Sequence, residues 1–464
     1  MNVRRARVPH NRSAHTHNRA VCPLSVLLAI CCCLSSVSSQ WLETTIPLPD
    51  SLGGVSYPQC LAYDSTNNTV YVGGAYSDCV IAIDGATRQK IARIPAGANV
   101  RALCFNQTNN KIYCANYAGN SVTVVDGATN SVIATVTAGS HPNALCYNAT
   151  DNKVYCANES SGNVTVINGT ADSVIATVTA GCVPQALCYN PTNNKVYCAN
   201  DSSDDVTVID GATESVITTV AGGVNALCYN SRDDKIYCAG STVAVIDGVG
   251  DTLIASVPVS GCVLFYNPQN NKVYCVGRFT DSVVVIDGAA DSVIATAPAG
   301  DRPQALCYNP TDNKVYCSNR GVANVTVTDG ATNSVVATVV VGDWPFDFCH
   351  NPIQNRVYVA NLEGSSISVL RDSGGGIEES FKPQAASTKP APTVIRGVLC
   401  LPLASSVERE ASSVLLDISG RKALDLHPGA NDVRALAPGV YFVREKPQAA
   451  SPKPQAIRKV VLTR

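Results

Sequence analysis

Cysteine is the residue type in this chain whose number and spacing point most directly to chemistry. Four of the 21 cysteines lie within residues 1–39, which leaves 17. Ten of these recur in pairs that are ten residues apart: Cys104 with Cys114, Cys146 with Cys156, Cys188 with Cys198, Cys228 with Cys238, and Cys307 with Cys317. In an oxidising compartment, cysteines that face each other across a hairpin form disulfides. These ten residues are therefore candidate disulfide partners.

Other copies of the same pattern test that idea. Three of them have a cysteine at one position and an apolar residue at the other: Cys60 with Val72, Cys275 with Phe265, and Cys349 with Val359. An essential bond would lose both partners together, so the pattern favours small, buried, apolar thiols over disulfides. It predicts paired cysteines that are close neighbours, buried and mostly unbonded. No metal site is expected, because the spacing within each pair is ten rather than two.

Motifs of catalysis are the next candidates. The sequence has no nucleophile elbow, phosphate loop, HExxH motif or EF-hand. Its central part holds only His141, His350 and, besides Trp41, a single tryptophan, Trp344. Haem, copper and quinone sites need more histidines, acidic clusters or docking tryptophans. The sequence therefore predicts no cofactor and leans against an enzyme, without deciding the question.

The elements that must position these residues form a repeat. Its anchors are Tyr71, Tyr113, Tyr155, Tyr197, Tyr237, Tyr274, Tyr316 and Tyr358, with spacings of 42, 42, 42, 40, 37, 42 and 42. Each copy has four short runs rich in β-branched and aromatic residues, separated by Asn, Asp, Gly or Ser, which is typical of strands. This pattern predicts an all-β fold, an eight-bladed propeller of four-stranded antiparallel blades, with seven blades as the alternative.

Ring closure leaves a trace in the sequence. The eighth copy supplies only three strands, whereas residues 43–48 form a spare strand before the first copy. We expect residues 44–48 to pair antiparallel with residues 366–370 as the outermost strand of the eighth blade. That pairing would remove two exposed sheet edges, and Pro47 is tolerable there because the strand lies at an edge.

The repeat also resembles a known family. Tyr155-Cys156-Ala157-Asn158, followed by Val-Thr-Val-Ile and Ser-Val-Ile-Ala-Thr-Val, is similar to the YVTN-family β-propeller repeat over roughly residues 40–371. The resemblance implies a cell-surface or secreted protein without a common catalytic site. Many relatives have seven blades, so eight copies would be a departure.

The two ends of the chain predict export. Residues 1–39 carry five arginines, no acidic residue, an apolar stretch and then small residues, a pattern typical of a cleavable secretory signal. Removing them changes the formal charge from −2 to −7. No basic stripe remains in the propeller, so nucleic acid is not an expected partner, and no transmembrane span is expected.

After residue 371 the composition changes. Residues 372–392 read as a flexible linker, and residues 393–464 as a small β-sandwich with strands near 393–399, 413–417, 439–444 and 457–463. The segments 416–422, 436–444 and 459–462 resemble the C-terminal sorting domain of type IX secretion. The resemblance implies that secretion machinery is a partner, and an ordinary terminal sandwich is the alternative.

The repeat also indicates where a ligand would bind. The first and third turns of each blade lie on one side of the disc and are nearly constant; we call it the constant face. The second turns and the inter-blade loops lie on the other side, the variable face, and differ from copy to copy. Binding residues are usually presented on loops of a rigid scaffold, although the variation also fits neutral drift of solvated loops. The candidate ligand-binding residues are Arg101, His141, Arg278, Phe279, Arg302, Arg320, Trp344 and Phe346, because aromatic residues and arginine dominate binding hot spots.

The sequence thus predicts a secreted, extracellular or surface-attached propeller that binds an unknown protein or glycan without catalysis. Two alternatives stay open. One is an extracytoplasmic hydrolase or lyase that uses the central funnel, which convergent His, Asp or Glu side chains with perturbed pKa values would favour. The other is a structural component of a surface layer, which self-assembly would favour.

Overall fold

A computed structural model describes residues 40–49, 54–222, 225–277 and 279–372, together with the backbone of seven strands between residues 393 and 462. The chain divides into two compact units, Met1–Ile377 and Glu378–Arg464. The predicted signal and most of the predicted linker lie outside the described residues, and those expectations stay predictions.

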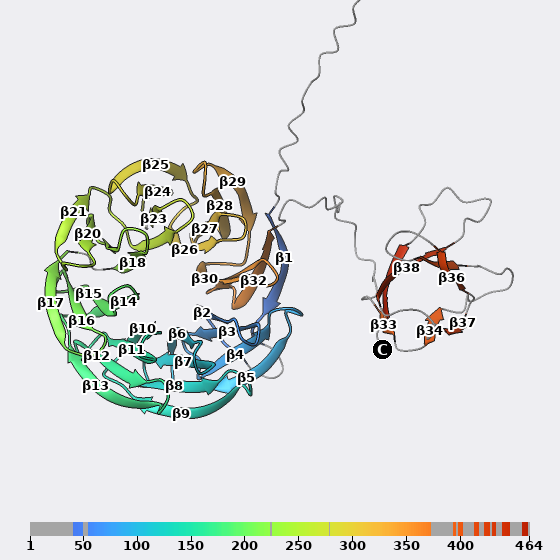
Figure 1. Ribbon diagram of the computed structural model, residues 1–464, viewed down its shortest axis with the longest axis horizontal. Coiled ribbons are helices and arrows are strands. Elements are labelled where there is room, and N and C mark those ends of the chain that lie inside the picture. Colours follow the sequence, from blue (N-terminus) through green and yellow to red (C-terminus); the bar gives the residue numbers. More distant parts are fainter. Residues whose placement is uncertain are drawn as a thin grey trace, which may run out of the picture. The chain divides into compact units, whose positions relative to one another are not determined.

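The first unit is a ring of eight four-stranded antiparallel sheets, as the repeat predicts (Figure 1). Blade 1 contains β2 (Pro58–Asp64), β3 (Thr69–Gly74), β4 (Cys79–Asp84) and β5 (Lys90–Pro95). Blade 2 contains β6 (Val100–Asn106), β7 (Lys111–Asn116), β8 (Ser121–Asp126) and β9 (Ser131–Thr137). Blade 3 contains β10 (Pro142–Asn148), β11 (Lys153–Asn158), β12 (Asn163–Asn168) and β13 (Ser173–Thr179). Blade 4 contains β14 (Pro184–Asn190), β15 (Lys195–Asn200), β16 (Asp205–Asp210) and β17 (Val216–Ala221).

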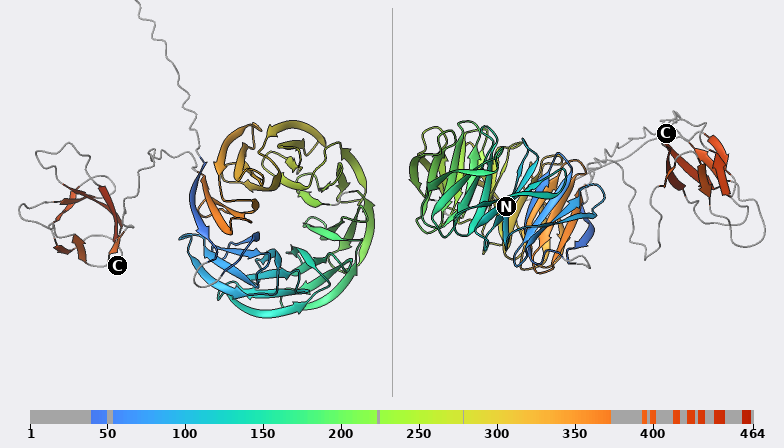
Figure 2. Two further views of the ribbon diagram at one scale, coloured as in Figure 1. Left: turned by 180° about the vertical axis from the view of Figure 1, so that it is seen from behind. Right: turned by 90° about the horizontal axis from the view of Figure 1, so that it is seen from below.

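The other half of the ring repeats this order, and Figure 2 shows the ring from behind and from below. Blade 5 contains β18 (Ala226–Asn230), β19 (Lys235–Ala239), β20 (Val243–Asp247) and β21 (Leu253–Val257). Blade 6 contains β22 (Val263–Asn267), β23 (Lys272–Val276), β24 (Ser282–Asp287) and β25 (Ser292–Pro298). Blade 7 contains β26 (Pro303–Asn309), β27 (Lys314–Asn319), β28 (Asn324–Asp329) and β29 (Val335–Val340). Blade 8 contains β30 (Pro345–Asn351), β31 (Arg356–Asn361), β32 (Ser366–Asp372) and β1 (Gln40–Pro47).

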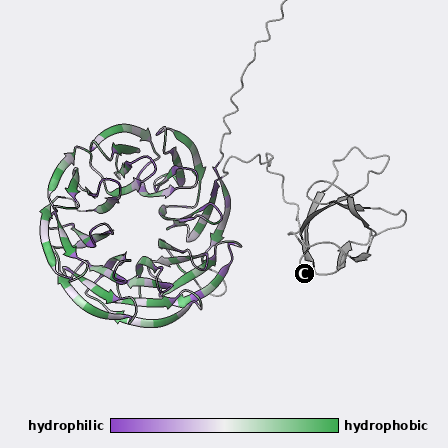
Figure 3. Ribbon diagram, in the orientation of Figure 1, coloured by the Kyte–Doolittle hydropathy of each residue, from purple (hydrophilic) through white to green (hydrophobic). Residues whose placement is uncertain are grey.

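The core lies between adjacent blades. In blade 3, β11 buries five of its six residues, because both faces of the sheet are covered by neighbouring blades. Tyr113 and Val124 of blade 2 pack against Cys156 and Ile167 of blade 3, and every other junction repeats this arrangement with its own residues. The outermost strands differ, since β13 buries only one of seven residues. Apolar residues therefore also appear along the rim (Figure 3).

Ring closure follows the prediction. Strand β1 pairs antiparallel with β32, with Thr44 opposite Val369 and Pro47 opposite Ser366, and it forms the free edge of the blade-8 sheet. The strand is longer than predicted and starts at Gln40, which lies opposite Asp372. A β-bulge between Leu42 and Thr44 interrupts the register, and the bulge carries Glu43.

The constancy of the constant face has a structural cause. The anchor tyrosine and the lysine two residues before it reach across to the third turn of the next blade. Tyr113 Oη donates to Asp172 Oδ1 at 2.9 Å, and Lys111 Nζ donates to Asp172 Oδ2 at 2.7 Å and to the Gly169 carbonyl at 2.9 Å. Asparagine side chains at the ends of the inner strands form a second inter-blade contact, such as Asn106 Nδ2 to Asn152 Oδ1 at 2.8 Å. These residues hold neighbouring blades together, which explains why they recur.

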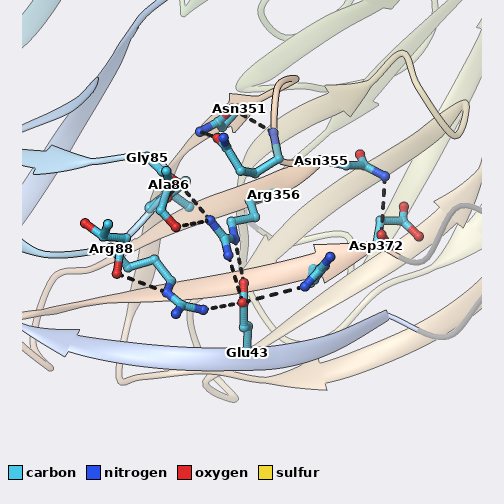
Figure 4. A network of polar contacts seen from close by, with 12 residues as sticks. Glu43, Gly85, Ala86, Arg88, Asn351, Asn355, Arg356 and Asp372 are labelled. Atoms are coloured by element: carbon cyan, nitrogen blue, oxygen red, sulfur yellow. Dashed lines mark hydrogen bonds and ion pairs between the residues drawn. The ribbon is translucent and has the colours of Figure 1, made fainter. Parts of the chain in front are cut away.

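At the two junctions that blade 8 makes with its neighbours, other residues replace these inter-blade hydrogen bonds. Blade 8 has no third turn of its own, and Asp372 accepts hydrogen bonds from Lys314 Nζ at 2.5 Å, Tyr316 Oη at 2.8 Å and Gln40 Nε2 at 2.7 Å. At the junction with blade 1, Arg356 replaces the lysine and donates to the carbonyls of Gly85 and Ala86 at 2.7 and 3.0 Å. Arg356 also holds the Glu43 carboxylate through two bonds of 2.6 and 2.9 Å (Figure 4).

The cysteines require a correction. Cys146 lies opposite Tyr155, whereas Cys156 lies opposite Leu145, so the two thiols point to opposite faces of the blade. The other four candidate pairs have the same register: Cys104 and Cys114, Cys188 and Cys198, Cys228 and Cys238, and Cys307 and Cys317. The idea that they face each other across a hairpin is therefore wrong, and the described cysteines form no disulfides. The repeat position of Cys104 is occupied in blade 1 by Ala62, opposite Tyr71, and not by Cys60.

Thiol reactivity follows from this arrangement. Among the described cysteines only Cys182 is exposed, and burial raises the pKa of Cys104, Cys188 and Cys307 to about 12. Because the thiolate is the reacting form, brief alkylation of the native protein should modify Cys182 well before the other described cysteines. Peptide mass mapping checks this. Disulfide-linked peptides that join the predicted pairs in the unreduced protein would contradict it.

The second unit contains the strands that the structure describes near the C-terminus. They are β33 (Thr393–Ile395), β34 (Val398–Leu401), β35 (Ser413–Leu416), β36 (Lys422–Leu426), β37 (Gly429–Asp432), β38 (Gly439–Glu445) and β39 (Ile457–Leu462). Five of them form a sheet in the order β33-β39-β38-β35-β36, and β34 pairs with β37. Whether they build a sandwich that serves sorting stays a prediction. Within the described part of the chain, no helix has the length and apolarity needed to cross a bilayer.

Candidate functional site

On the variable face, the second turn of six of the eight blades is hydrogen-bonded to the loop that enters the same blade. The amide of Tyr117 donates to the Asn99 carbonyl at 2.8 Å, and that of Glu159 donates to the His141 carbonyl at 2.9 Å. Blades 1, 4, 7 and 8 repeat this bond with Ala75 to Tyr57, Asp201 to Val183, Arg320 to Arg302, and Leu362 to Trp344. The two variable segments therefore form one continuous surface in each of these blades.

The residue that supplies this carbonyl has a left-handed backbone conformation. Its φ is positive in all six blades: Tyr57 (52°), Asn99 (61°), His141 (58°), Val183 (61°), Arg302 (53°) and Trp344 (55°). Five of the six precede proline, which also restricts the backbone of the preceding residue. For residues other than glycine, asparagine and aspartate, this conformation is uncommon and costs about 1–2 kcal/mol.

The first turns of all eight blades provide an internal comparison. Their left-handed positions are held by Asn68, Asn110, Asn152, Asn194, Asp234, Asn271, Asn313 and Asn355, the residue types that tolerate this conformation best. On the variable face the same conformation is adopted by Asn99 in blade 2, but by Tyr, His, Val, Arg and Trp in the other five blades. The residue types at these positions are therefore not explained by how easily they adopt the left-handed backbone conformation. Strain of this kind is often found at functional sites, where the surrounding structure maintains it.

A β-bulge follows two residues later. The register of the inner strand shifts in the same six blades, for example between Pro142 and Ala144. The bulged residues are Gln59, Arg101, Asn143, Gln185, Gln304 and Phe346. Bulges re-aim a side chain out of the regular ladder. We call the left-handed residue, the next residue and the bulged residue the inlet triplet of a blade; it is His141-Pro142-Asn143 in blade 3.

Two of the predicted site residues, Arg101 and His141, contact the ring of Tyr117, which was not predicted, in a stack between blades 2 and 3. The rings of Tyr117 and His141 lie 4.4 Å apart at an interplanar angle of 14°, and the Arg101 guanidinium lies 5.0 Å from the centre of the Tyr117 ring. Tyr117 Oη donates to Glu159 at 3.3 Å, and His141 Nδ1 lies 2.5 Å from Ser160 Oγ. The stack fixes both aromatic rings and presents a cation and a carboxylate beside them.

The junction of blades 7 and 8 builds the same kind of stack. The Arg320 guanidinium lies 3.9 Å from the centre of the Trp344 ring, a cation–π distance. As with Tyr117 and His141, the first residue of a second turn packs against the left-handed residue of the following blade. Between the two stacks, Tyr57 and Tyr76 of blade 1 form an edge-to-face pair with centroids 5.6 Å apart.

The other predicted site residues do not all lie close together. Arg302 and Phe346 lie in the inlet triplets of blades 7 and 8, beside the Arg320–Trp344 stack. Phe279, which is 92% exposed, belongs to the second turn of blade 6, the blade before the one that carries Arg302 and Arg320. Arg278 lies outside the described residues. Tyr57 and Tyr76 were missed, although Tyr57 precedes Pro58 just as His141 precedes Pro142.

An enzyme would need ionisable side chains with shifted pKa values, and two such residues, Asp347 and His350, lie in β30. Burial raises the pKa of Asp347 to about 6, although its carboxylate accepts the Leu61 amide of blade 1 at 2.8 Å. Burial lowers the pKa of His350, against the hydrogen bond with Asn355 and the charge of Asp312 in blade 7, which both raise it. Because the two side chains point to opposite neighbouring blades, they do not form an acid–base pair. No group of three or more metal-ligating side chains converges within the described residues.

The raised pKa of Asp347 predicts that the stability of the fold depends on pH. Its pKa is about 6 in the folded protein and about 3.9 in an unfolded chain, so the folded state binds the extra proton between these values and loses stability as pH rises through them. The Asp347→Asn variant keeps an acceptor for the Leu61 amide. Because Asp347 is half-buried, we expect it to be about 1–2 kcal/mol more stable than wild type at pH 7. In denaturant titrations the gain should vanish near pH 4, and a gain of equal size at both pH values would contradict it.

Comparisons with known proteins agree on the fold. Two solved structures cover most of the ring: hydrazine synthase from Kuenenia stuttgartiensis is 17% identical, covers 68% of this chain and 96% of its own, and has a TM-score of 0.51. The computationally designed Ika8 protein is 16% identical, covers 70% of this chain and 99% of its own, and has a TM-score of 0.58. At such identities the likeness concerns the fold alone. No curated protein matches the chain significantly. The family model described as YNCE-like beta-propeller matches residues 41–352, and the chain belongs to that family.

Proposed function

We propose that this protein is a secreted, surface-displayed binding scaffold whose ligand, a protein or a glycan, is held by the variable face without catalysis. The observation that carries the proposal is the series of bulky residues in left-handed conformations at the inlet triplets. The proposed site extends over blades 7, 8, 1, 2 and 3. We call it the ligand arc: Arg302, Arg320, Trp344, Phe346, Tyr57, Arg101, Tyr117 and His141.

The composition of the variable face supports this choice of blades. The ligand arc contributes aromatic rings from four blades and guanidinium groups from two, and both stacked pairs lie within it. Blade 4, by contrast, presents Val183 and Gln185 in its inlet triplet and Asp201 in its second turn. Rigid aromatic anchors with arginine beside them are the side chains that contribute most to binding energy at interfaces.

A glycan and protein array probed with the full chain tests the proposal. We expect a set of ligands that wild type binds and that the variant with both Tyr117→Ala and Trp344→Ala does not, with a loss of at least about tenfold in affinity. Val183→Ala with Asp201→Ala changes the equivalent positions of blade 4, the left-handed residue and the first residue of the second turn, and serves as the matched control. Equal binding by both double variants would refute the ligand arc.

Export is the second part of the proposal. The leader and the resemblance of residues 393–464 to a type IX sorting domain support it. Deleting residues 393–464 should leave the propeller in the periplasm of the producing cell, because the sorting signal would be lost. Fractionation with an antibody to the propeller measures this. Normal surface delivery of the truncated chain would refute the sorting role.

One observation favours the structural alternative, a surface-layer component. Val132, Ile133, Val174, Ile175, Val216, Ile217, Leu253, Ile254, Val293 and Ile294 on the outer strands are between 39% and 50% exposed. Repeated apolar side chains of this kind mark interaction surfaces. Sedimentation of the purified full chain distinguishes the two: concentration-dependent assembly that Ile175→Asp and Ile217→Asp abolish would favour the layer.

A further inference from the structure

The stack between blades 2 and 3 holds two charged groups whose hydrogen-bonding capacity the fold does not use up. The Arg101 guanidinium lies over the Tyr117 ring, 5.0 Å from its centre, and donates no hydrogen bond within the described residues. Glu159 accepts from Tyr117 Oη at 3.3 Å through Oε1, and its Oε2 accepts nothing from the part of the chain that the structure describes. Arg101 is exposed and Glu159 is half-buried. A ligand at this stack therefore meets free donors over the ring and a free acceptor at its hydroxyl end.

The bulged residues of the neighbouring blades, by contrast, are bonded within the fold. Gln59 of blade 1 donates to Asn99 Oδ1 of blade 2 at 2.9 Å, and Asn143 of blade 3 donates to Gln185 Oε1 of blade 4 at 2.8 Å. Arg101 occupies the same bulged position in blade 2 but makes no such bond to a described residue of blade 3. Contact between blades therefore does not explain why this position holds an arginine, whereas contact with a ligand does.

The charges of Arg101 and Glu159 offset each other, and this balance restricts the chemistry of the ligand. A carboxylate would be attracted by Arg101 and repelled by Glu159, and an amine would meet the reverse. An apolar protein surface would bury both charges without new partners, which is costly. A hydroxyl group has one donor hydrogen and two acceptor lone pairs, so adjacent hydroxyls satisfy both side chains and add no charge. The stack therefore suits a neutral, polyhydroxylated ligand.

Blade 1 supplies an open aromatic surface beside this pair. Tyr76 is 85% exposed and stands edge-to-face with Tyr57, with ring centres 5.6 Å apart and an interplanar angle of 77°. Both residues have left-handed backbones, with φ of 56° and 52°, and the Ala75 amide donates to the Tyr57 carbonyl at 3.0 Å. Unlike the ring of Tyr117, which its neighbours in the stack cover, a ring as exposed as that of Tyr76 has an open face. The C–H groups of a sugar ring pack on an aromatic face of this kind.

We propose that the ligand of this face is a neutral oligosaccharide, which packs one sugar ring on Tyr76 while the hydroxyls of another accept from Arg101 and donate to Glu159. The assignment rests on the proposed function, because it names the ligand class of the same site. The three residues belong to blades 1, 2 and 3, so a chain of several sugar units, and not a monosaccharide, contacts all of them. Tyr76 and Glu159 thereby join the residues of the ligand arc in contacting the ligand.

The test titrates the full chain with neutral hexasaccharides of glucose, mannose, xylose and N-acetylglucosamine in a calorimeter. We expect Tyr76→Ala and Glu159→Ala each to weaken binding about tenfold. Tyr76→Phe keeps the ring and Glu159→Gln keeps an acceptor oxygen, so both should stay within about threefold of wild type. Raising the salt concentration from about 0.05 to 0.5 M should leave the affinity unchanged, because the ligand carries no charge. Asp201→Ala changes the position of blade 4 that is equivalent to Glu159 and should have no effect.

The outcomes separate this assignment from the function on which it rests. If the array yields a protein or a polyanion that the Tyr117→Ala, Trp344→Ala variant no longer binds, and no neutral hexasaccharide binds, the ligand arc stands and the neutral oligosaccharide is overturned. Affinity that falls with salt, tighter binding by Glu159→Gln, or equal losses in Glu159→Ala and Asp201→Ala would also overturn it. If the array yields no ligand that the double variant loses, the proposed function itself fails.

Discussion

Replacing Glu43 by alanine is expected to lower the free energy of unfolding by about 3 kcal/mol. The carboxylate lies in the β1 bulge and is the counter-ion of Arg356, whose side chain is only 7% exposed, and of Arg88. Without Glu43, a buried guanidinium would remain next to two further cations. Removing one partner of a buried pair is costly because the other charge stays buried and unpaired. Since Glu43 joins β1 to β31 and to blade 1, the loss should open the ring at its closing strand.

The effect should depend on pH in a defined direction. Burial alone would raise the pKa of Glu43, but the hydrogen bond from Arg356 and the charges of Arg356, Arg88 and Arg371 outweigh it and hold the pKa below its usual value. A lowered pKa adds stability that is present above the unfolded value of about 4.3 and is lost as pH falls through the folded value. Denaturant titrations should therefore show a large difference between wild type and Glu43→Ala at pH 7 that shrinks in strong acid.

Two comparisons make this result specific. Glu159→Ala removes a carboxylate from a turn of the variable face and should cost less than about 1 kcal/mol. The double variant Glu43→Leu with Arg356→Met removes both buried charges and should recover part of the stability, as apolar replacements of buried pairs do. A cost below 1 kcal/mol for Glu43→Ala, unchanged between pH 7 and acid, would mean that the ion cluster does not hold the ring closed.

The architecture was accessible from sequence because each blade repeats the same local rules. Five of the seven tyrosine spacings are 42, and the apolar runs and turn residues recur from copy to copy, so errors in one copy are corrected by the others. Closure was predictable for a different reason: the eighth copy lacks a strand, and residues 43–48 have no other place. The pairing of β1 with β32 follows from that count, whereas the register, with Thr44 opposite Val369, does not.

The predictions that failed are those that depend on a one-residue difference in strand register. Cys146 and Cys156 seem matched by their constant spacing, but the hairpin pairs Cys146 with Tyr155, and a shift of one residue turns a side chain to the opposite face. The left-handed backbone of His141 and the bulge at Asn143 are likewise fixed by the bond between the second turn and the inter-blade loop. Propensity cannot reveal them, since the same position holds tryptophan and valine in other copies, and these residues do not favour that conformation. Glu43 lies outside the repeat, so no comparison among copies could mark it.

Replacing Asp372 by alanine is expected to have the largest effect, a loss of about 4 kcal/mol. Its side chain is 1% exposed and accepts from Lys314 at 2.5 Å, Tyr316 at 2.8 Å and Gln40 at 2.7 Å. The variant would leave a buried ammonium group without its carboxylate and two further donors without this acceptor. Because Asp372 is the last residue of β32 and lies opposite the first residue of β1, the change should also loosen both ends of the ring.

Asp172 provides the matched control within the same molecule. It accepts from Lys111 at 2.7 Å and Tyr113 at 2.9 Å, but its side chain is 14% exposed and lies in a turn that the continuous chain holds in place. Asp172→Ala should therefore cost only about 2 kcal/mol. Hydrogen exchange separates the two cases further: Asp372→Ala should speed exchange in β1 and β32, whereas Asp172→Ala should affect blades 2 and 3. If both variants lost equal stability and β1 kept its protection, Asp372 would be one more inter-blade clamp, and closure would depend on the Glu43 cluster instead.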